Sequence, residues 1–106
     1  EMFKVSGATV YPSEVERALL AVQGVRAAHV TDITGSGVTH VGALVVTGLP
    51  AAEVHRRVRP ALSSFKVPTR WIVTDDEALV PRLGSGKPDI DALRRMLQDH
   101  GRGATD

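Results

Sequence analysis

The chain has 106 residues, 42% of them hydrophobic, and its thirteen Lys and Arg residues nearly balance its twelve Asp and Glu residues, for a formal net charge of +1. This length allows one modest hydrophobic core and therefore one domain. The balanced charge argues against an electrostatic nucleic-acid binder, so we interpret the arginine clusters at 56–59 and 94–95 as solvated helix faces.

Cysteine is absent, which excludes disulfides and thiolate chemistry and fits a cytoplasmic protein. No stretch approaches the roughly 20 apolar residues that a membrane span needs, and the chain does not open on a signal-peptide pattern. The four histidines show no ligand spacing with one another, so we expect no metal site.

The first 24 residues predict a two-stranded ribbon followed by a helix. Residues 2–5 form a short strand, which turns and pairs back with residues 9–11. Ser13 and Glu16 have the spacing of a capping box, in which each side chain accepts a hydrogen bond from the backbone amide of the other residue. The helix, which Gly24 ends, places its apolar residues on one face: Val15, Ala18, Leu19 and Val22.

A β-hairpin is expected next, with strands at 25–33 and 38–47 joined by the loop 34–37. Both strands are rich in valine and alanine, and the loop sequence Thr-Gly-Ser-Gly is typical of a turn. Gly42, inside the second strand, indicates either a β-bulge or a close approach of another part of the chain.

The second half predicts a helix at 51–62, whose last turn Pro60 should distort, a strand at 70–74 and a helix at 89–97. The last helix is expected to bury four residues: Ile90, Leu93, Met96 and Leu97. Residues 101–106 are expected to fray.

Residues 1–100 are therefore expected to form an α+β domain. Its predicted architecture is a small, mostly antiparallel three-stranded sheet flanked by helices, with an N-terminal two-stranded ribbon. Hairpin strands alternate with helices in this sequence without a strict parallel repeat, which is why we expect mainly antiparallel pairing. We find no internal repeat or linker in this range.

Lys87 lies at the end of a glycine-hinged loop, after Gly84, Ser85 and Gly86. Pro88 then fixes the backbone and Asp89 opens the last helix, so this lysine lies between a flexible arm and a fixed base. The stretch is not a phosphate-binding P-loop, because that motif requires Ser or Thr after the lysine. By itself, the pattern is more typical of a solvated surface lysine.

Three sequence motifs, which follow one another along the chain, add to this pattern. They are Met-Phe-Lys-Val-Ser-Gly-Ala-Thr-Val-Tyr-Pro-Ser-Glu-Val-Glu at 2–16, Phe-Lys-Val-Pro at 65–68, and Pro-Arg-Leu-Gly-Ser-Gly-Lys at 81–87. In this order and spacing, they resemble the C-terminal domain of the adenylate-forming acyl-CoA synthetases, non-ribosomal peptide adenylation domains and luciferases. The resemblance covers nearly the whole chain and implies the same fold, with a large N-terminal domain as partner.

The resemblance implies an AMP-forming acid–thiol ligase that uses ATP with Mg²⁺ and CoA. It assigns to Lys87 a role in adenylate formation, in which a substrate carboxylate attacks the α-phosphate of ATP. Two anions meet in that step, and a positive donor in a water-excluded site offsets their repulsion. The magnesium is expected to arrive with ATP and to be held by the larger domain.

The resemblance also implies a second state, reached by rotation of the small domain, in which the acyl group passes to a thiol. It places Gly7 in the wall of the pantetheine tunnel, although an ordinary turn glycine is an alternative. Three residues flank Gly7 and would face the active site in that state: Lys4, Ala8 and Thr9. Phe65 is expected at the nucleotide end of CoA and Arg70 near a CoA phosphate, with a core aromatic and a surface arginine as alternatives.

The sequence departs from the family pattern at Pro88, where relatives carry an aliphatic residue, and in lacking the arginine often found shortly after the lysine. The hinge is expected just before Glu1, and the isolated chain is expected to be inactive because the large domain binds ATP and the acyl group. Three functions stay open: part of an acyl- or aryl-CoA ligase, part of an adenylation domain that loads a carrier protein, or a non-catalytic protein-docking module.

Overall fold

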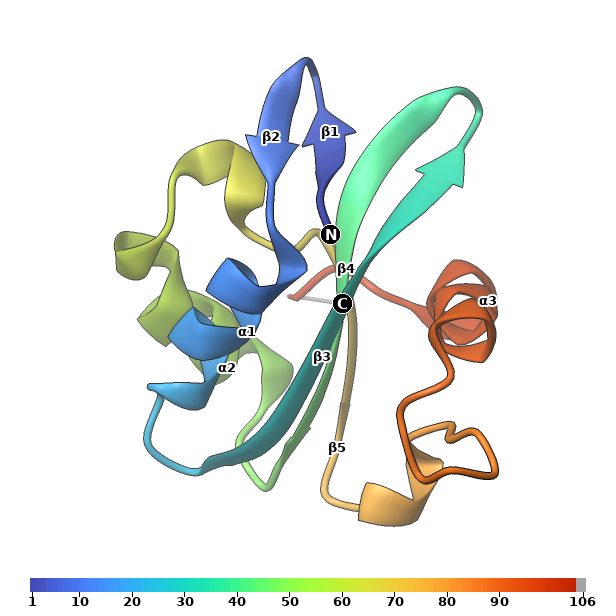
Figure 1. Ribbon diagram of the computed structural model, residues 1–106. Coiled ribbons are helices and arrows are strands. Elements are labelled where there is room, and N and C mark those ends of the chain that lie inside the picture. Colours follow the sequence, from blue (N-terminus) through green and yellow to red (C-terminus); the bar gives the residue numbers. More distant parts are fainter. Residues whose placement is uncertain (105–106) are drawn as a thin grey trace.

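The computed structural model describes residues 1–104, which form a three-stranded sheet with helices on both faces and a small separate ribbon (Figure 1). The strands are β1 (Phe3–Val5), β2 (Ala8–Val10), β3 (Val25–Gly35), β4 (Val38–Thr47) and β5 (Arg70–Thr74). The α-helices are α1 (Pro12–Leu20), α2 (Ala51–Val58) and α3 (Ile90–His100). The predicted α+β class and N-terminal ribbon are confirmed.

The sheet is buried on both faces. On one face, α1 and α2 pack against β-strand side chains that include Val30, Val41, Ala43 and Val45. On the other face, Leu93 and Leu97 of α3 pack against Ile33, Leu44 and Val46. Because both faces are covered, β4 is buried continuously from residue 41 to residue 47, without the polar alternation of a half-exposed strand.

The sheet is mixed, with order β3-β4-β5. β3 and β4 pair antiparallel as a hairpin, whereas β4 and β5 pair parallel. The sequence analysis expected mainly antiparallel pairing and did not identify the parallel pair. Parallel neighbours need a crossover connection, and here α2 and the short 3-10 turns that follow it return the chain to the same end of the sheet.

Both hairpins turn on a Ser-Gly pair with positive φ at each residue. The angles are 50° and 82° at Ser6 and Gly7, and 55° and 77° at Ser36 and Gly37. Such pairs are typical of the type I′ turns that join twisted strands. The second hairpin loop is therefore two residues long, shorter than the predicted loop 34–37, since β3 continues to Gly35.

The predicted capping box of α1 is wrong. Pro12 occupies the start of the helix, so Tyr11 is the N-cap and Ser13 already lies inside the first turn, without a capping hydrogen bond. The Glu16 carboxylate instead accepts a hydrogen bond of 3.0 Å from the backbone amide of Val30, on β3. Glu16 thus links α1 to the sheet, and its partial burial raises the pKa of its carboxyl group, although the hydrogen bond opposes this effect.

The distortion predicted at Pro60 is confirmed, because α2 ends at Val58 and continues as a 3-10 turn, Arg59–Ala61. In α3, Asp89 is the N-cap and accepts a hydrogen bond from the amide of Ala92. The prediction that Ile90 is buried is wrong: this side chain is 40% exposed, in the first helical turn and at the wall of a surface hollow that Met2 also lines.

Part of the tail that was expected to fray belongs to the fold. Arg102 exchanges two backbone hydrogen bonds with Trp71, of 2.8 and 3.0 Å, which protects the open edge of β5. Ala104 packs against the core. The expectation of fraying therefore fails for residues 101–104, and residues 105–106 lie outside the described part of the chain.

Gly42 is a close-approach site rather than a bulge. A Cβ atom there would lie 2.5 Å from Cδ1 of Ile33 and 3.0 Å from Cδ1 of Leu97. The irregularity in the β3–β4 pairing lies elsewhere, between Val25 and Ala27. The missing side chain at residue 42 thus makes room for the contact between α3 and the sheet.

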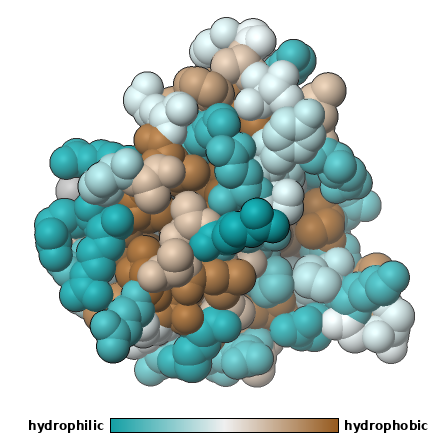
Figure 2. All heavy atoms as spheres, turned by 60° about the vertical axis from the view of Figure 1, so that its left-hand side comes forward, coloured by the Kyte–Doolittle hydropathy of each residue, from teal (hydrophilic) through white to brown (hydrophobic). Residues whose placement is uncertain are grey.

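The layer formed by α1 and α2 covers the sheet but leaves apolar surface in contact with solvent. Figure 2 shows this face, where hydrophobic areas lie between hydrophilic side chains. Leu20, at the end of α1, is 49% exposed, and Tyr11, just before the helix, is 50% exposed. Neither residue belongs to the core.

Substituting Gly42 tests the packing of α3. Gly42→Ala is expected to destabilise the chain by about 1–3 kcal/mol in urea denaturation, because the added methyl group overfills a packed core. Gly48→Ala is the matched control, since a Cβ atom there meets nothing within 4 Å. Adding Ile33→Val removes the clashing Cδ1 atom and should recover part of the loss. Simple addition of the two single-variant costs would contradict the contact.

Glu16 should make stability depend on pH. Since its folded-state pKa is raised from the ordinary 4.5, the folded state binds the proton more tightly than the unfolded state. The contribution of Glu16 to the free energy of unfolding is therefore most favourable below about pH 4.5, and it falls as the pH rises through the folded-state pKa. Glu16→Gln should remove this fall in pH-dependent denaturation curves, whereas Ser13→Ala should leave stability unchanged. A clear loss of stability in Ser13→Ala would restore the capping box.

Candidate functional site

The loop that carries Lys87 is a closed turn with a defined backbone. The amide of Leu83 donates to the carbonyl oxygen of Lys87 at 2.8 Å, and the amide of Gly86 donates to the carbonyl oxygen of Leu83 at 2.9 Å. At the base, the amide of Asp89 donates to the carbonyl oxygen of Pro81 at 2.9 Å. The backbone around the lysine is therefore held on both sides, which differs from the freely hinged arm that the two glycines suggested.

Of the two loop glycines, only Gly86 needs the conformational freedom of glycine, with a φ of 91°. Gly84 has no positive φ, and a Cβ atom at either position would meet nothing within 4 Å. Arg82 reinforces the turn, because its guanidinium donates to the carbonyl oxygen of Gly86 at 3.0 Å. The hydroxyl of Ser85 faces the amide of Lys87 at 3.5 Å, the limit of a hydrogen bond.

The side chain of Lys87 is exposed. Within residues 1–104, its ammonium group makes no hydrogen bond and no ion pair, although its backbone is bonded on both sides. By contrast, the ammonium group of Lys66 pairs with Glu14 and that of Lys4 donates to Thr9. Lys87 thus presents an uncommitted positive charge at the tip of an ordered loop, which could bind an anionic group outside this domain.

Burial, together with the charges of Arg82 and Glu77 near the base of this loop, shifts the pKa of a histidine. His29, on β3, has a buried Nε2 atom without a hydrogen-bond partner among the described residues. Its pKa is lowered by burial first and then by the positive charge of Arg82, while Glu77 acts in the opposite direction. Burial and the charge of Arg82 thus both favour the neutral form of His29.

Gly7 occupies the turn of the β1–β2 ribbon, where its positive φ alone accounts for a glycine. A Cβ atom there would meet nothing within 4 Å, so the surface beside Gly7 is open. Lys4 and Thr9 face each other across the ribbon, at 2.7 Å between Nζ and Oγ1, and Ala8 is half-buried. The ribbon thus brings together Lys4, Gly7, Ala8 and Thr9 as predicted neighbours.

The two other residues expected to contact CoA lie outside this ribbon. Phe65 is 37% exposed in the 3-10 turn Ser64–Lys66, and the ammonium group of Lys66 lies 5.6 Å from the centre of its ring. Arg70 is exposed at the start of β5, and its guanidinium donates to the carbonyl oxygen of Gly101 at 3.1 Å. Phe65 is thus not a core aromatic, and Arg70 is a surface arginine that also ties down the C-terminal segment.

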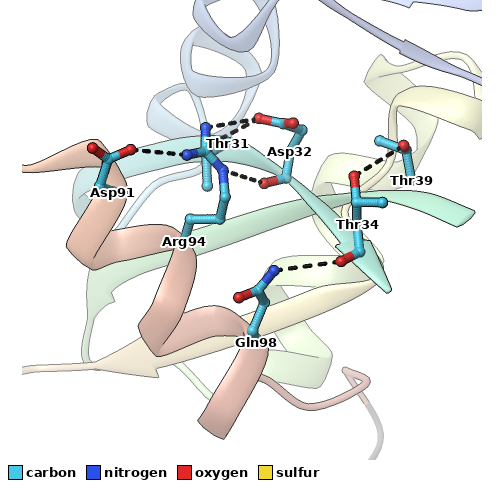
Figure 3. Close-up of polar contacts among 7 residues, drawn as sticks. All are labelled: Thr31, Asp32, Thr34, Thr39, Asp91, Arg94 and Gln98. Carbon is cyan, nitrogen blue, oxygen red and sulfur yellow. Dashed lines mark hydrogen bonds and ion pairs between the residues drawn. The ribbon is translucent and has the colours of Figure 1, made fainter. Parts of the chain in front are cut away.

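The sequence analysis missed the role of Arg94, which was interpreted as part of a solvated face. Figure 3 shows its guanidinium between α3 and β3. It donates to the backbone oxygen of Asp32 at 3.1 Å, to the Asp32 carboxylate at 3.0 Å and to the hydroxyl of Thr31 at 3.2 Å. It also pairs with Asp91, at 3.1 Å. The available signal was its position between Leu93 and Leu97, the two buried residues of the helix.

Two negative findings concern the described residues. None of the helices in residues 1–104 combines the length and the apolar character that crossing a membrane requires. Over the same residues, no group of three or more His, Cys, Asp or Glu side chains could hold a metal ion.

The sequence of this chain is similar to parts of known proteins. It is 41% identical over 101 residues to an isonitrile lipopeptide synthase of Streptomyces coeruleorubidus, an alignment that covers 92% of this chain and 7% of the synthase. It is 35% identical over 101 residues to the 3-[(3aS,4S,7aS)-7a-methyl-1,5-dioxo-octahydro-1H-inden-4-yl]propanoyl:CoA ligase of Mycobacterium tuberculosis, covering 91% of this chain and 19% of the ligase. No protein-family model matches the chain.

A solved structure shares its fold. The ATP-bound MatB of Rhodopseudomonas palustris superposes with a TM-score of 0.78 at 29% identity, over 92% of this chain and 20% of the MatB chain. The chain thus spans between 7% and 20% of the length of these three proteins. It corresponds to one small part of each larger enzyme.

The order of the lysine loop can be tested with its two glycines. Gly86→Ala is expected to cost about 1–2 kcal/mol of local stability, because an alanine is strained at positive φ. Hydrogen exchange at the backbone amides of residues 83 and 86 should become faster in this variant. Gly84→Ala is the control, because residue 84 is also exposed but has no positive φ, and it should leave exchange unchanged. Equal acceleration in both variants would contradict the closed turn.

Proposed function

Because the chain belongs to the C-terminal domains of the adenylate-forming enzymes, we propose that it is the mobile domain of an ATP-dependent acyl- or aryl-CoA ligase. The observation that supports this proposal most is the uncommitted ammonium group of Lys87 on an ordered loop. The relatives are much longer than this chain, so the reaction is proposed for the parent enzyme, with ATP and the acid bound by its larger domain.

In the first half-reaction, a carboxylate oxygen of the acid attacks the α-phosphorus of ATP and pyrophosphate leaves. Negative charge accumulates as the two anions approach. Lys87 donates to the carboxylate and phosphate oxygens and offsets this repulsion. Because its ammonium group has no partner within residues 1–104, no ion pair of this domain has to break first. Magnesium bound with ATP in the larger domain would neutralise further phosphate charge.

In the second half-reaction, the thiol of CoA attacks the acyl carbon and AMP leaves. The β1–β2 ribbon forms one wall of the path for the thiol arm, with Gly7 at its turn. The open space beside this glycine, together with the neighbouring Lys4, Ala8 and Thr9, supports this assignment. Phe65 and Arg70 contact the nucleotide end of CoA, where an exposed ring can stack and a guanidinium can bind phosphate.

The 41% identity to a lipopeptide synthase supports a second candidate: an adenylation domain that loads a carrier protein. Its chemistry is the same up to the thiol, which then sits on a protein-bound phosphopantetheine arm. The product separates the two candidates. Thioester on free CoA supports the ligase, whereas transfer only to a phosphopantetheinyl carrier protein supports the adenylation domain.

Lys87→Ala in the parent enzyme should lower adenylate formation by roughly 10²–10³-fold, the usual cost of losing one preorganised donor. Transfer from a supplied acyl-adenylate to the thiol should survive, since Lys87 serves only the first half-reaction. Pyrophosphate exchange and thioester release measure the two steps. Arg95→Ala, which removes another exposed cation of this domain, should change neither. An unchanged rate of adenylate formation in Lys87→Ala would refute the assignment.

Gly7 has a natural twin for its test, because Gly37 has nearly the same φ in a second Ser-Gly turn with equally open space. Gly7→Ala and Gly37→Ala therefore carry similar backbone strain. Only Gly7→Ala should slow thioester formation, with adenylate formation preserved, because its methyl group enters the path of the thiol arm. Equal effects of the two substitutions would identify Gly7 as an ordinary turn glycine.

A further inference from the structure

Building on the proposed function, we infer that Arg94 is a positioning residue for adenylate formation: it fixes α3 along β3 and thereby sets where Lys87 points. Arg94 lies seven residues after the lysine and has no contact with the lysine itself. Its effect would pass through the helix and the base of the loop.

The first step of this inference is the way in which α3 carries the lysine. The helix begins at Ile90, three residues after Lys87, and its N-cap Asp89 belongs to the loop base. The amide of Asp89 bonds to Pro81, while its carboxylate accepts from Ala92 in the first turn of α3. The hydrogen bonds of this turn hold the backbone of Lys87, and its ammonium group has no further bond within residues 1–104, so the position of the side chain depends on the turn.

The second step is what holds the helix itself. Leu93 and Leu97 bury their side chains against the sheet, and this apolar contact is non-directional. The guanidinium of Arg94, in contrast, makes directional bonds to two adjacent residues of β3 (Figure 3). Thr31 is only 3% exposed, so one of these bonds ends at a fixed, buried hydroxyl.

The contribution of Asp91 is smaller. Its side chain is 80% exposed, and such surface pairs add little to stability. A second link between α3 and β3 lies one turn further from the lysine, where the side-chain amide of Gln98 donates to the backbone oxygen of Thr34 at 3.4 Å. This long bond leaves Arg94 as the main polar link near the N-terminal end of the helix.

The consequence for catalysis follows from geometry. A catalytic group misplaced by about 1 Å can cost on the order of 10² in rate, even when the substitution lies far from the chemistry. Loss of the Arg94 fork should therefore reduce kcat for adenylate formation without weakening the binding of ATP, which the larger domain provides.

The experiment uses the full-length parent enzyme and the variant Arg94→Met. Methionine keeps an apolar side chain but lacks the guanidinium that bonds to Thr31 and Asp32. We expect kcat for adenylate formation to fall by about tenfold or more, with KM for ATP and transfer from a supplied acyl-adenylate unchanged. Arg94→Lys keeps the charge without the planar fork and should recover only part of the rate. Gln98→Ala, the matched control on the same helix, should behave like the parent.

An unchanged kcat in Arg94→Met, equal loss in both half-reactions, or an equal effect of Gln98→Ala would overturn the inference. If Arg94→Met does not fold, Asp32→Asn is the second variant, because it weakens only the charged acceptor of Arg94. It should lower kcat for adenylate formation to a smaller extent. An unchanged kcat in Asp32→Asn would also overturn the inference. Lys87→Ala is measured in parallel. If the proposed function is wrong, this variant keeps its rate of adenylate formation. If only the inference about Arg94 is wrong, Lys87→Ala loses that rate and Arg94→Met does not.

Discussion

Two backbone hydrogen bonds fix the loop that carries Lys87. In one, the amide of Leu83 donates to the carbonyl oxygen of Lys87, and in the other, the amide of Asp89 donates to the carbonyl oxygen of Pro81. They close the loop on both sides of the lysine and join it to the first turn of α3. The side chain of Lys87 meanwhile stays exposed and unbonded within residues 1–104. An ordered backbone with a free ammonium group suits preorganised electrostatic catalysis, because little reorganisation is needed at the moment of reaction.

The rest of the fold supports α3, the helix that follows this loop. The central sheet is buried on both faces, α3 packs into the space left by Gly42, and Arg94 and Glu16 add polar links from the helices to β3. In the proposed reaction, the domain presents first the lysine loop and later the β1–β2 ribbon to the larger domain, which would require it to turn as a unit. Packing on both faces of the sheet would hold the domain together in such a turn, since the ribbon packs against the cluster on one face and α3 against the cluster on the other.

Local patterns predicted what depends on neighbours in sequence. The hairpin strands, the break at Pro60 and the cap at Asp89 all follow from residues a few positions apart. What the sequence did not reveal depends on distant contacts. Pro12 displaced the expected capping box of α1, and Glu16 found a partner on β3. The parallel β4–β5 pair required a crossover.

The candidate site divides in the same way. The motif around Lys87 predicted a loop at this place and is the basis of the chemistry proposed for it, whereas the closure of that loop by hydrogen bonds was not evident from two glycines. Arg94 was overlooked because an arginine on a helix is usually solvated, and only the fold shows it beside Thr31 and Asp32. Residues that act through long-range contacts have no local signature, so the structure was needed to identify them.

The most direct test of this account is a crystal structure of the parent enzyme bound to a non-reactive acyl-adenylate analogue. The account predicts that Nζ of Lys87 lies about 3 Å from a phosphate or carboxylate-derived oxygen of the analogue, with the 81–89 turn closed as it is here. A lysine that remains in solvent, or pairs with an acidic side chain while the analogue is bound, would contradict it.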